Sequence, residues 1–234
     1  RNGSINTDSV YRIGDTTVLS VKGSENIFAG WGSGINNNTG TSNTATGYKA
    51  LFSTTTGQRN ASIGAHSLYS STTGSENISI GDSSSYSGNG YYNTIIGTRA
   101  GKNNTGSWTS IIGIDAGKSN QANGNVFVGS AAGMKNTSGS GNTFVGDNAG
   151  RENITASGNS FFGSFAGALN TGANNAAFGQ IALASNTSGA GNAAFGTWAL
   201  NRNTTASANT AVGSSALFFN TTGANNSAIG FHSL

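Results

Sequence analysis

The sequence predicts an all-β fold, a parallel β-roll or β-solenoid in which each coil is one sequence repeat. Three observations predict it. The motif Asn-x-x-apolar-Gly recurs every 16 or 17 residues. The apolar residue before the Gly is usually β-branched or aromatic, which favours strands over helices. The chain contains no Pro, so nothing interrupts parallel ladders between coils.

Residues 1–22 precede the repeat and predict an N-terminal adaptor or capping hairpin. The segment from Val10 to Val21 reads as two strands around a Gly14-Asp15 turn. A solenoid needs such a cap because its terminal coil exposes an unpaired strand edge. The chain begins at Arg1 without an initiator Met, so we expect it to be an excerpt of a longer protein.

Residues 23–234 form the predicted repetitive domain, with 13 coils. Each coil has room for two strands of about five residues and two turns. The recurring Asn is expected to form a side-chain amide ladder from coil to coil. The copies begin at Asn26, Asn43, Asn60, Asn77, Asn93, Thr109, Asn125, Asn142, Asn159, Asn175, Asn192, Asn209 and Asn226.

The interior is predicted by a covariation between two repeat positions. We call the second residue after the Asn the inner site, and the fourth residue after the motif Gly the facing site. A large inner residue such as Phe144 occurs with Gly150 at the facing site, whereas the small Ala177 occurs with Leu183. Twelve of the 13 copies follow this rule, and the exception pairs Ser79 with Ser85. Conserved combined volume indicates that the two sites fill one space.

Adjacent apolar residues in the strands predict a partner chain. In pairs such as Phe127-Val128 and Phe161-Phe162, neighbouring side chains point to opposite faces of a strand. A single coil has only one interior, so the second face is expected to be covered by another chain. This argument predicts an oligomer without fixing its order.

Two segments carry a resemblance to a known family: Asn-Thr-Ala-Val-Gly-Ser-Ser-Ala-Leu at 209–217 and Asn-Ser-Ala-Ile-Gly-Phe-His-Ser-Leu at 226–234. They resemble the head repeats of YadA-type trimeric autotransporter adhesins. They are also similar to the repeats of trimeric tail-fibre-like surface proteins of bacteria and phages. The resemblance covers residues 23–234 and implies a left-handed parallel β-roll assembled as a side-by-side homotrimer. It also implies an extracellular location, as a cell-surface fibre or a phage tail fibre.

Composition excludes several classes of function. Without Cys, the chain has no disulfide and no cysteine metal or redox site. Charged residues make up only 8% and the net charge is +3, which disfavours nucleic acid as a partner. No apolar run approaches the roughly 20 residues of a membrane span, so this segment is not expected to insert in a membrane. With two His and no catalytic motif, we expect neither enzymatic activity nor a cofactor or metal.

Candidate ligand-binding residues stand at variable positions of the repeat. Directly before the Asn, successive copies place Arg59, Glu76, Tyr92 and Trp108, with Tyr86 and Tyr91 in the neighbouring loop. Exposed aromatic rings offer an apolar surface with polar tips, which suits sugar rings. The alternative is a loop that packs against itself or against another subunit.

A second candidate is a basic column five residues after the motif Gly. It contains Lys102, Lys118 and Arg151, with Lys135 beside it. These cations could contact a phosphate-rich envelope polysaccharide. The alternative is solvated charge that prevents edge-to-edge association.

Three functions therefore stay open. The first is a trimeric fibre adhesin that binds cell-surface glycans during attachment or recognition of host or prey. The second is an inert shaft that carries a recognition tip elsewhere. The third, ice binding, requires an unbroken Thr ladder and is disfavoured because Thr clusters near the ends, at 54–56, 72–73 and 221–222.

Overall fold

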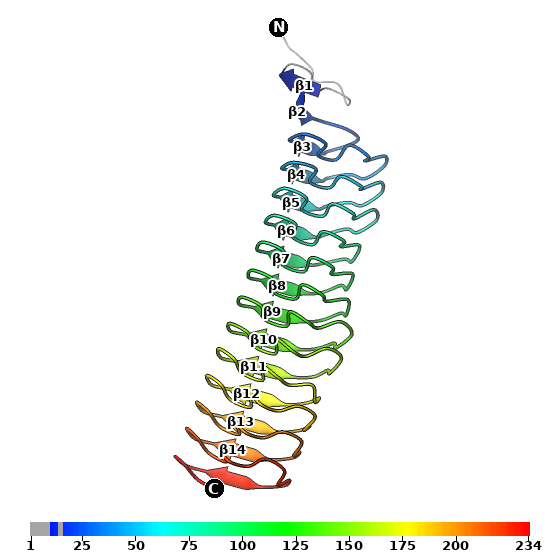
Figure 1. Ribbon diagram of the computed structural model, residues 1–234. Helices are drawn as coiled ribbons and strands as arrows, with labels where there is room; N and C mark the ends of the chain where they lie inside the picture. Colours follow the sequence, from blue (N-terminus) through cyan, green and yellow to red (C-terminus); the bar gives the residue numbers. More distant parts are fainter. Residues whose placement is uncertain (1–9, 14–15) are drawn as a thin grey trace. The chain divides into compact units, whose positions relative to one another are not determined.

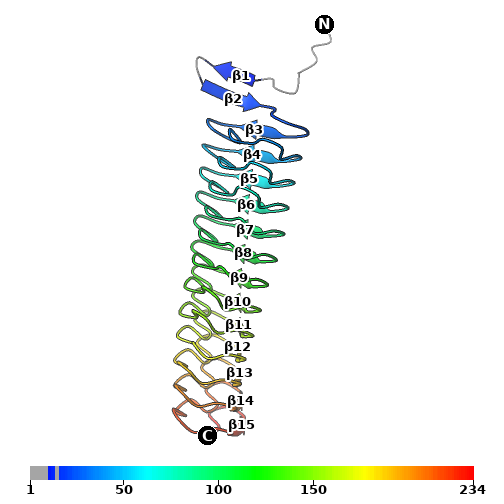
Figure 2. The ribbon, with the colours of Figure 1, turned by 90° about the vertical axis from the view of Figure 1, so that its right-hand side faces the viewer.

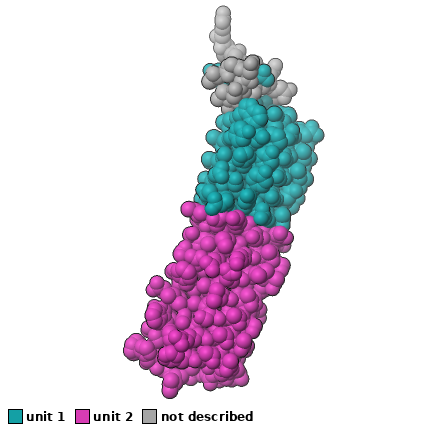
Figure 3. Space-filling model, viewed as in Figure 1, with its two compact units in different colours: residues 1–109 teal, residues 110–234 magenta. Residues whose placement is uncertain are grey.

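The computed structural model describes residues 10–13 and 16–234. Within them the protein is all-β, a parallel β-solenoid of about twelve turns without a helix. It follows that no helix in the described part could span a membrane. The chain divides into two compact units, residues 1–109 and 110–234, coloured separately in Figure 3. The count of 13 coils, the trimer, and the division at residue 22 stay predictions.

Unit 1 begins with an antiparallel pair, β1 (Val10–Ile13) and β2 (Thr16–Ser20), visible in Figure 2. This agrees with the expected strands, whereas the predicted Gly14-Asp15 turn lies outside the described residues. Strand β2 continues antiparallel onto the first repeat strand, where Leu19 pairs with Ala29. The parallel strands of the unit are β3 (Ile27–Ala29), β4 (Thr44–Thr46), β5 (Ala61–Ile63), β6 (Ile78–Ile80) and β7 (Thr94–Ile96).

Unit 2 consists of eight parallel strands, each paired in register with the next along the chain (Figure 1). Phe144, for example, pairs with Phe127 on one side and Phe161 on the other. Identical repeat positions are therefore neighbours. The strands are β8 (Ser110–Ile112), β9 (Val126–Val128), β10 (Thr143–Val145), β11 (Ser160–Phe162), β12 (Ala176–Phe178), β13 (Ala193–Phe195), β14 (Thr210–Val212) and β15 (Ser227–Ile229).

Each described coil contains one strand of three residues, so the expectation of two five-residue strands per coil was wrong. The reason lies after the motif Gly, where alternate residues adopt positive φ. In the second copy Gly47, Lys49 and Leu51 have φ of 139°, 53° and 50°. Alternating left-handed residues cannot extend into a strand. Instead the segment forms tight turns, such as the 3.3 Å hydrogen bond from the Ala50 N–H to the Gly47 carbonyl.

The motif Gly is required by close approach between coils. Gly146 has a φ of 136°, and a Cβ at this position would lie 2.5 Å from the carbonyl of Gly163 in the next coil. A side chain would push the coils apart and break the backbone hydrogen bonds between them. Glycine at this position therefore sets the stacking distance.

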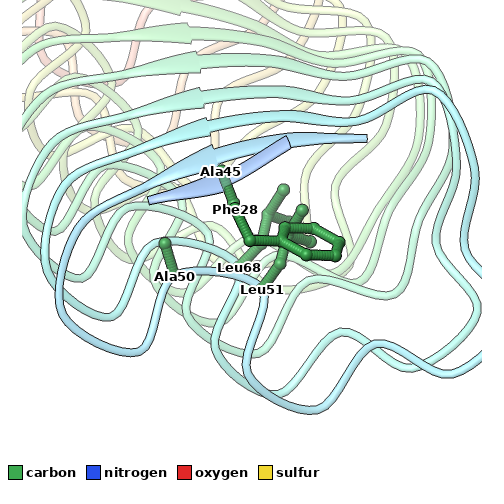
Figure 4. Close-up of a cluster of buried hydrophobic side chains, with 5 residues drawn as sticks. All are labelled: Phe28, Ala45, Ala50, Leu51 and Leu68. Carbon is green, nitrogen blue, oxygen red and sulfur yellow. The ribbon is translucent and has the colours of Figure 1, made fainter. Parts of the chain in front are cut away.

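The interior confirms that inner and facing sites share one space. Phe127, Phe144 and Phe161 are fully buried and stack with centroids 5.1 and 4.9 Å apart. A Cβ on Gly150 would lie 2.5 Å from the ring of Phe144, so no side chain fits there. Where the inner site is small, as at Ala45, a Leu fills the space instead. Figure 4 shows this arrangement in unit 1, where Phe28, Ala45, Ala50, Leu51 and Leu68 form one buried cluster.

The copy that departs from the volume rule has a polar interior. Ser79 is buried, and its hydroxyl lies 2.9 Å from those of both Ser67 and Ser84. Ser62 in the preceding coil is also buried and donates to the Ser67 carbonyl. Hydrogen bonds between small side chains here replace the apolar filling.

The recurring Asn does form a ladder, but chiefly with the backbone. Asn142 accepts a hydrogen bond from the Asn159 N–H at 3.0 Å and donates to the Ala156 carbonyl at 2.9 Å. Thr109 stands at the Asn position of one coil, where its N–H and hydroxyl both donate to Asn93 Oδ1. Side-chain amide contacts occur in only some described coils, for example from Asn60 to Asn43 at 3.1 Å.

A second side-chain amide ladder, with a break at the unpartnered Asn153 Oδ1, exists at another repeat position, which the sequence analysis missed. In each coil this position lies eleven residues after the position of the motif Asn. In unit 2, Asn136 donates to Asn120 Oδ1 at 2.7 Å, and Asn153 donates to Asn136 Oδ1 at 2.9 Å. Asn203 donates in the same way to Asn186 at 2.8 Å. The recurrence of Asn at this spacing was the available signal.

The outer face of the sheet is apolar and half-exposed in unit 2. Phe162, Phe178 and Phe195 stack on it with centroids 4.7 and 5.0 Å apart. Phe162 and Phe195 keep 37% and 40% of their surface exposed. Within the unit, this second apolar face is not buried by the chain itself.

Candidate ligand-binding surface

Tyr92 and Trp108 lie at a turn position where every coil adopts a left-handed backbone. Their φ angles are 59° and 56°, close to the 65° and 64° of Gly124 and Gly141 at the same repeat position. Each turn is fixed by the preceding coil, since the Trp108 N–H donates to the Tyr91 carbonyl at 3.0 Å. A bulky residue here costs roughly 1–2 kcal/mol in backbone strain that glycine avoids.

The two rings stack on the outside, as the sequence predicts. Their planes differ by 4° and their centroids are 6.5 Å apart. This distance exceeds the 4.7–5.2 Å of the other parallel stacks, so the rings overlap only in part. Tyr92 and Trp108 are 53% and 63% exposed, and Tyr91 beside them is exposed as well. The pair therefore offers partly uncovered ring faces to a flat ligand.

The same position carries polar side chains in the other coils of unit 1. We call all residues at this position in unit 1, Tyr92 and Trp108 included, the edge column. Arg59 Nε donates to Glu76 Oε1 at 3.0 Å, and this hydrogen bond with the neighbouring charge raises the pKa of Arg59. Ser42 donates to Glu25 at 2.7 Å. The edge column consists of Glu25, Ser42, Arg59, Glu76, Tyr92 and Trp108.

In unit 2 the corresponding position is nearly bare. A Cβ added at Gly124, Gly141 or Gly191 would meet no atom within 4 Å. The remaining occupants are small or amide residues: Gly158, Asn174, Ala208 and Asn225. Large side chains at this turn are thus restricted to unit 1.

The basic column is largely neutralised by acids that the sequence analysis did not connect with it. Lys118 lies 3.3 Å from Asp115. Lys135 and Arg151 both contact Glu152, at 2.6 and 3.0 Å. These contacts, above all the hydrogen bond from Lys135, hold the pKa of Glu152 below its ordinary value. Three of the four predicted cations therefore face carboxylates.

The fourth cation, Lys102, lies with Tyr86 in a different cluster. Its Nζ is 5.8 Å from the Tyr86 ring centroid. Tyr86 stacks on Tyr69 at 4.9 Å, and Tyr69 stacks on Phe52 at 5.0 Å. All four residues stand five positions after the motif Gly, a regularity that could have been read from the sequence. The sequence analysis instead grouped Tyr86 with Tyr91 and Tyr92.

Threonine is more regular than the sequence analysis assumed. Thr171, Thr187 and Thr204 occupy one position in successive coils of unit 2, and each hydroxyl donates to the carbonyl of the next coil. One coil before Thr171, the same position is occupied by Ile154, so the threonine column is not continuous. Threonine thus also recurs away from the ends of the chain.

A metal-binding cluster was not expected from the composition. Across residues 10–13 and 16–234, no three His, Asp or Glu side chains lie close enough together to hold a metal ion.

No protein-family model matches the chain, and neither the curated proteins nor the solved structures gave a significant match. The resemblance to YadA-type heads and tail-fibre repeats therefore stays a prediction based on the motif itself.

Proposed function

We propose that the chain is the repetitive part of a homotrimeric extracellular fibre, at a cell surface or in a phage tail, that binds cell-surface glycans without catalysis. The observation that carries the proposal is the exposed Tyr92–Trp108 pair, at a left-handed turn where unit 2 carries only glycine, alanine or asparagine.

The chemistry of the pair suits sugar rings. Partly overlapping aromatic rings leave apolar surface for the C–H faces of a saccharide, while the Tyr92 hydroxyl and the Trp108 indole N–H supply polar tips. The Arg59–Glu76 pair belongs to the two coils that precede Tyr92 in the edge column, and it adds charged groups beside the rings. Such a site binds one saccharide weakly.

Assembly into a trimer would compensate for weak sites. The half-exposed Phe162, Phe178 and Phe195 column supports burial against another copy of the chain. Three identical sites gain avidity when the target surface is itself repetitive, as a cell envelope is.

A spacer role is the second candidate, and one observation favours it for unit 2. At the edge position that unit carries only glycine, alanine or asparagine, so it offers a ligand no aromatic or charged side chain. Both roles are compatible if unit 1 binds the ligand and unit 2 serves as a spacer.

Binding of the fluorescently labelled assembled protein to arrayed glycans and to whole cells tests the proposal. Tyr92→Gly/Trp108→Gly removes both rings but keeps the left-handed turn, and should abolish most binding. Trp198→Gly is the matched control, because Trp198 is also exposed and has a φ of 64° but lies in unit 2. If the correctly assembled protein binds no surface, the spacer role replaces the adhesin.

A further inference from the structure

Unit 1 holds a lysine ammonium group among four aromatic rings. Lys49 Nζ lies 5.2 Å from the ring centroid of Trp31, 5.3 Å from those of Tyr48 and Phe52, and 6.0 Å from that of Tyr69. These distances are within the range of cation–π attraction. The rings form two stacked pairs, Trp31–Tyr48 and Phe52–Tyr69. The Lys49 ammonium group therefore lies beside both stacked pairs.

The second ring stack continues along the unit, with a second lysine beside its last ring. Tyr86 extends the second stack beyond Tyr69, and Lys102 Nζ lies 5.8 Å from the Tyr86 ring. We call this set the aromatic–lysine strip: Trp31, Tyr48, Lys49, Phe52, Tyr69, Tyr86 and Lys102. Its side chains are half-buried or exposed.

The two cations of the strip differ from those of the basic column. Within the described residues, neither Lys49 nor Lys102 forms an ion pair, whereas Lys118, Lys135 and Arg151 each contact a carboxylate. In the same part of the chain, the hydroxyls of Tyr48, Tyr69 and Tyr86 make no hydrogen bond to protein. The strip thus presents two unpaired ammonium groups and three phenol donors.

The stacking decides which ligand chemistry fits. Rings at 4.9–5.2 Å with planes within 17° cover the faces that they turn toward one another, so the ring edges remain for contact with a ligand. The edge of an aromatic ring carries partial positive charge. Ring edges, phenol hydroxyls and ammonium groups all favour an acceptor that carries negative charge.

The spacing of the two lysines indicates an extended ligand. Lys49 and Lys102 belong to the second and fifth copies, three coils apart, which corresponds to roughly 14 Å along the stack. A single small anion cannot reach both, whereas consecutive acidic groups of a polymer can.

From these contacts we propose that the aromatic–lysine strip binds an anionic polysaccharide, whose carboxylate or phosphate groups meet Lys49 and Lys102. The inference rests on the proposed glycan binding and names its chemical class. It also assigns charge recognition to the strip instead of the basic column, while the Tyr92–Trp108 pair stacks on sugar rings.

The test is biolayer interferometry of the full assembled chain on three immobilised polymers: polygalacturonate for carboxylate, poly(glycerol phosphate) for phosphate, and neutral dextran. We expect binding to at least one anionic polymer and none to dextran. Lys49→Met/Lys102→Met keeps the apolar stems and should weaken binding on the order of tenfold or more, because the charge-assisted hydrogen bonds to the polymer are lost. The Arg pair, Lys49→Arg/Lys102→Arg, should restore most of it.

The matched control is Lys118→Met/Lys135→Met, which removes the same formal charge from carboxylate-paired positions. If the control loses as much binding as the Lys49/Lys102 variant, the polymer is attracted by net charge alone, and the proposal that the strip is its binding site is wrong. Equal binding to dextran overturns anion selectivity, and a change of assembly mass in the Lys49 variant shows that a second copy covers the strip. If cells are bound through Tyr92 and Trp108 while no anionic polymer binds, the strip is wrong and the proposed function stands.

Discussion

The ring of Phe144 occupies the space that a side chain at Gly150 would need. Gly150 has a φ of 57°, and its Cβ would lie 2.5 Å from Phe144 Cδ2 and Cε2. In other coils the large and small residues are exchanged: Leu183 is buried at the facing site, and the small Ala177 stands beside it at the inner site. Leu183 adopts a φ of 52°, so the turn keeps its backbone whichever residue fills the interior.

A substitution at one of these two sites should therefore be tolerated only together with the compensating substitution at the other site. We expect Phe144→Ala to lower the free energy of unfolding by about 3–5 kcal/mol through lost burial and a cavity. Gly150→Leu should cost about 1–3 kcal/mol by overpacking. The double variant recreates the Ala177–Leu183 type of coil and should recover much of the loss in urea denaturation. A double variant no better than the sum of the singles would show that the sites do not share space.

The asparagine ladder should be sensitive to loss of its side chain. Asn142→Ala leaves the Asn159 N–H and the Ala156 carbonyl without their partner, at about 1–3 kcal/mol for each buried group. Asn142→Thr should cost less, because another coil accommodates Thr109 at this position, with its hydroxyl hydrogen-bonded to the preceding Asn93. Chemical denaturation of both variants checks the order, and an Ala variant as stable as the Thr variant contradicts it.

The edge aromatic residues should contribute little to stability. Trp108→Gly loses the stacking on Tyr92, about 0.5–1.5 kcal/mol, but relieves a left-handed backbone of similar cost. Trp108→Ala loses the ring and keeps the strain, so it should be less stable than the Gly variant by about 1 kcal/mol. Thermal denaturation compares the two, and the reverse order would remove the strain argument.

Low pH should lower the stability of unit 2, because Glu152 becomes protonated. Its pKa is lower in the folded protein than the ordinary 4.5, so its ionised form stabilises the fold at neutral pH. That contribution is present above pH 4.5 and disappears as the pH falls through the depressed value. Wild type should therefore exceed Glu152→Gln in stability at pH 7, with a gap that closes below pH 4.5. In a Lys135→Met background the gap should already be smaller at neutral pH.

The oligomer predicted from the outer sheet face is checked by light scattering. Three chains of 23.4 kDa give about 70 kDa. Phe178→Lys places a charge in the half-exposed Phe column and should reduce the mass to that of one chain while circular dichroism stays β-rich. Ser188→Lys adds the same charge at an exposed position of the same coil, away from the strand, and should leave the mass unchanged. A monomeric wild-type protein would contradict the proposed trimer.

The repeat period, the pairing of inner and facing volumes and the stacking of Tyr92 on Trp108 could all be predicted from the sequence. They share one physical cause: in a parallel solenoid each residue lies beside its counterpart one period later, so contacts between coils can be read from the spacing alone. Relations within a coil depend on where the backbone turns. The left-handed residues between Gly47 and Leu51 replace the expected second strand. The turns also bring Lys135 and Arg151 to Glu152, and direct Lys49 between two ring stacks. The sequence by itself thus determined the order along the stack, and only the tertiary structure decided which side chains meet across a coil, because turn angles rather than spacing place them there.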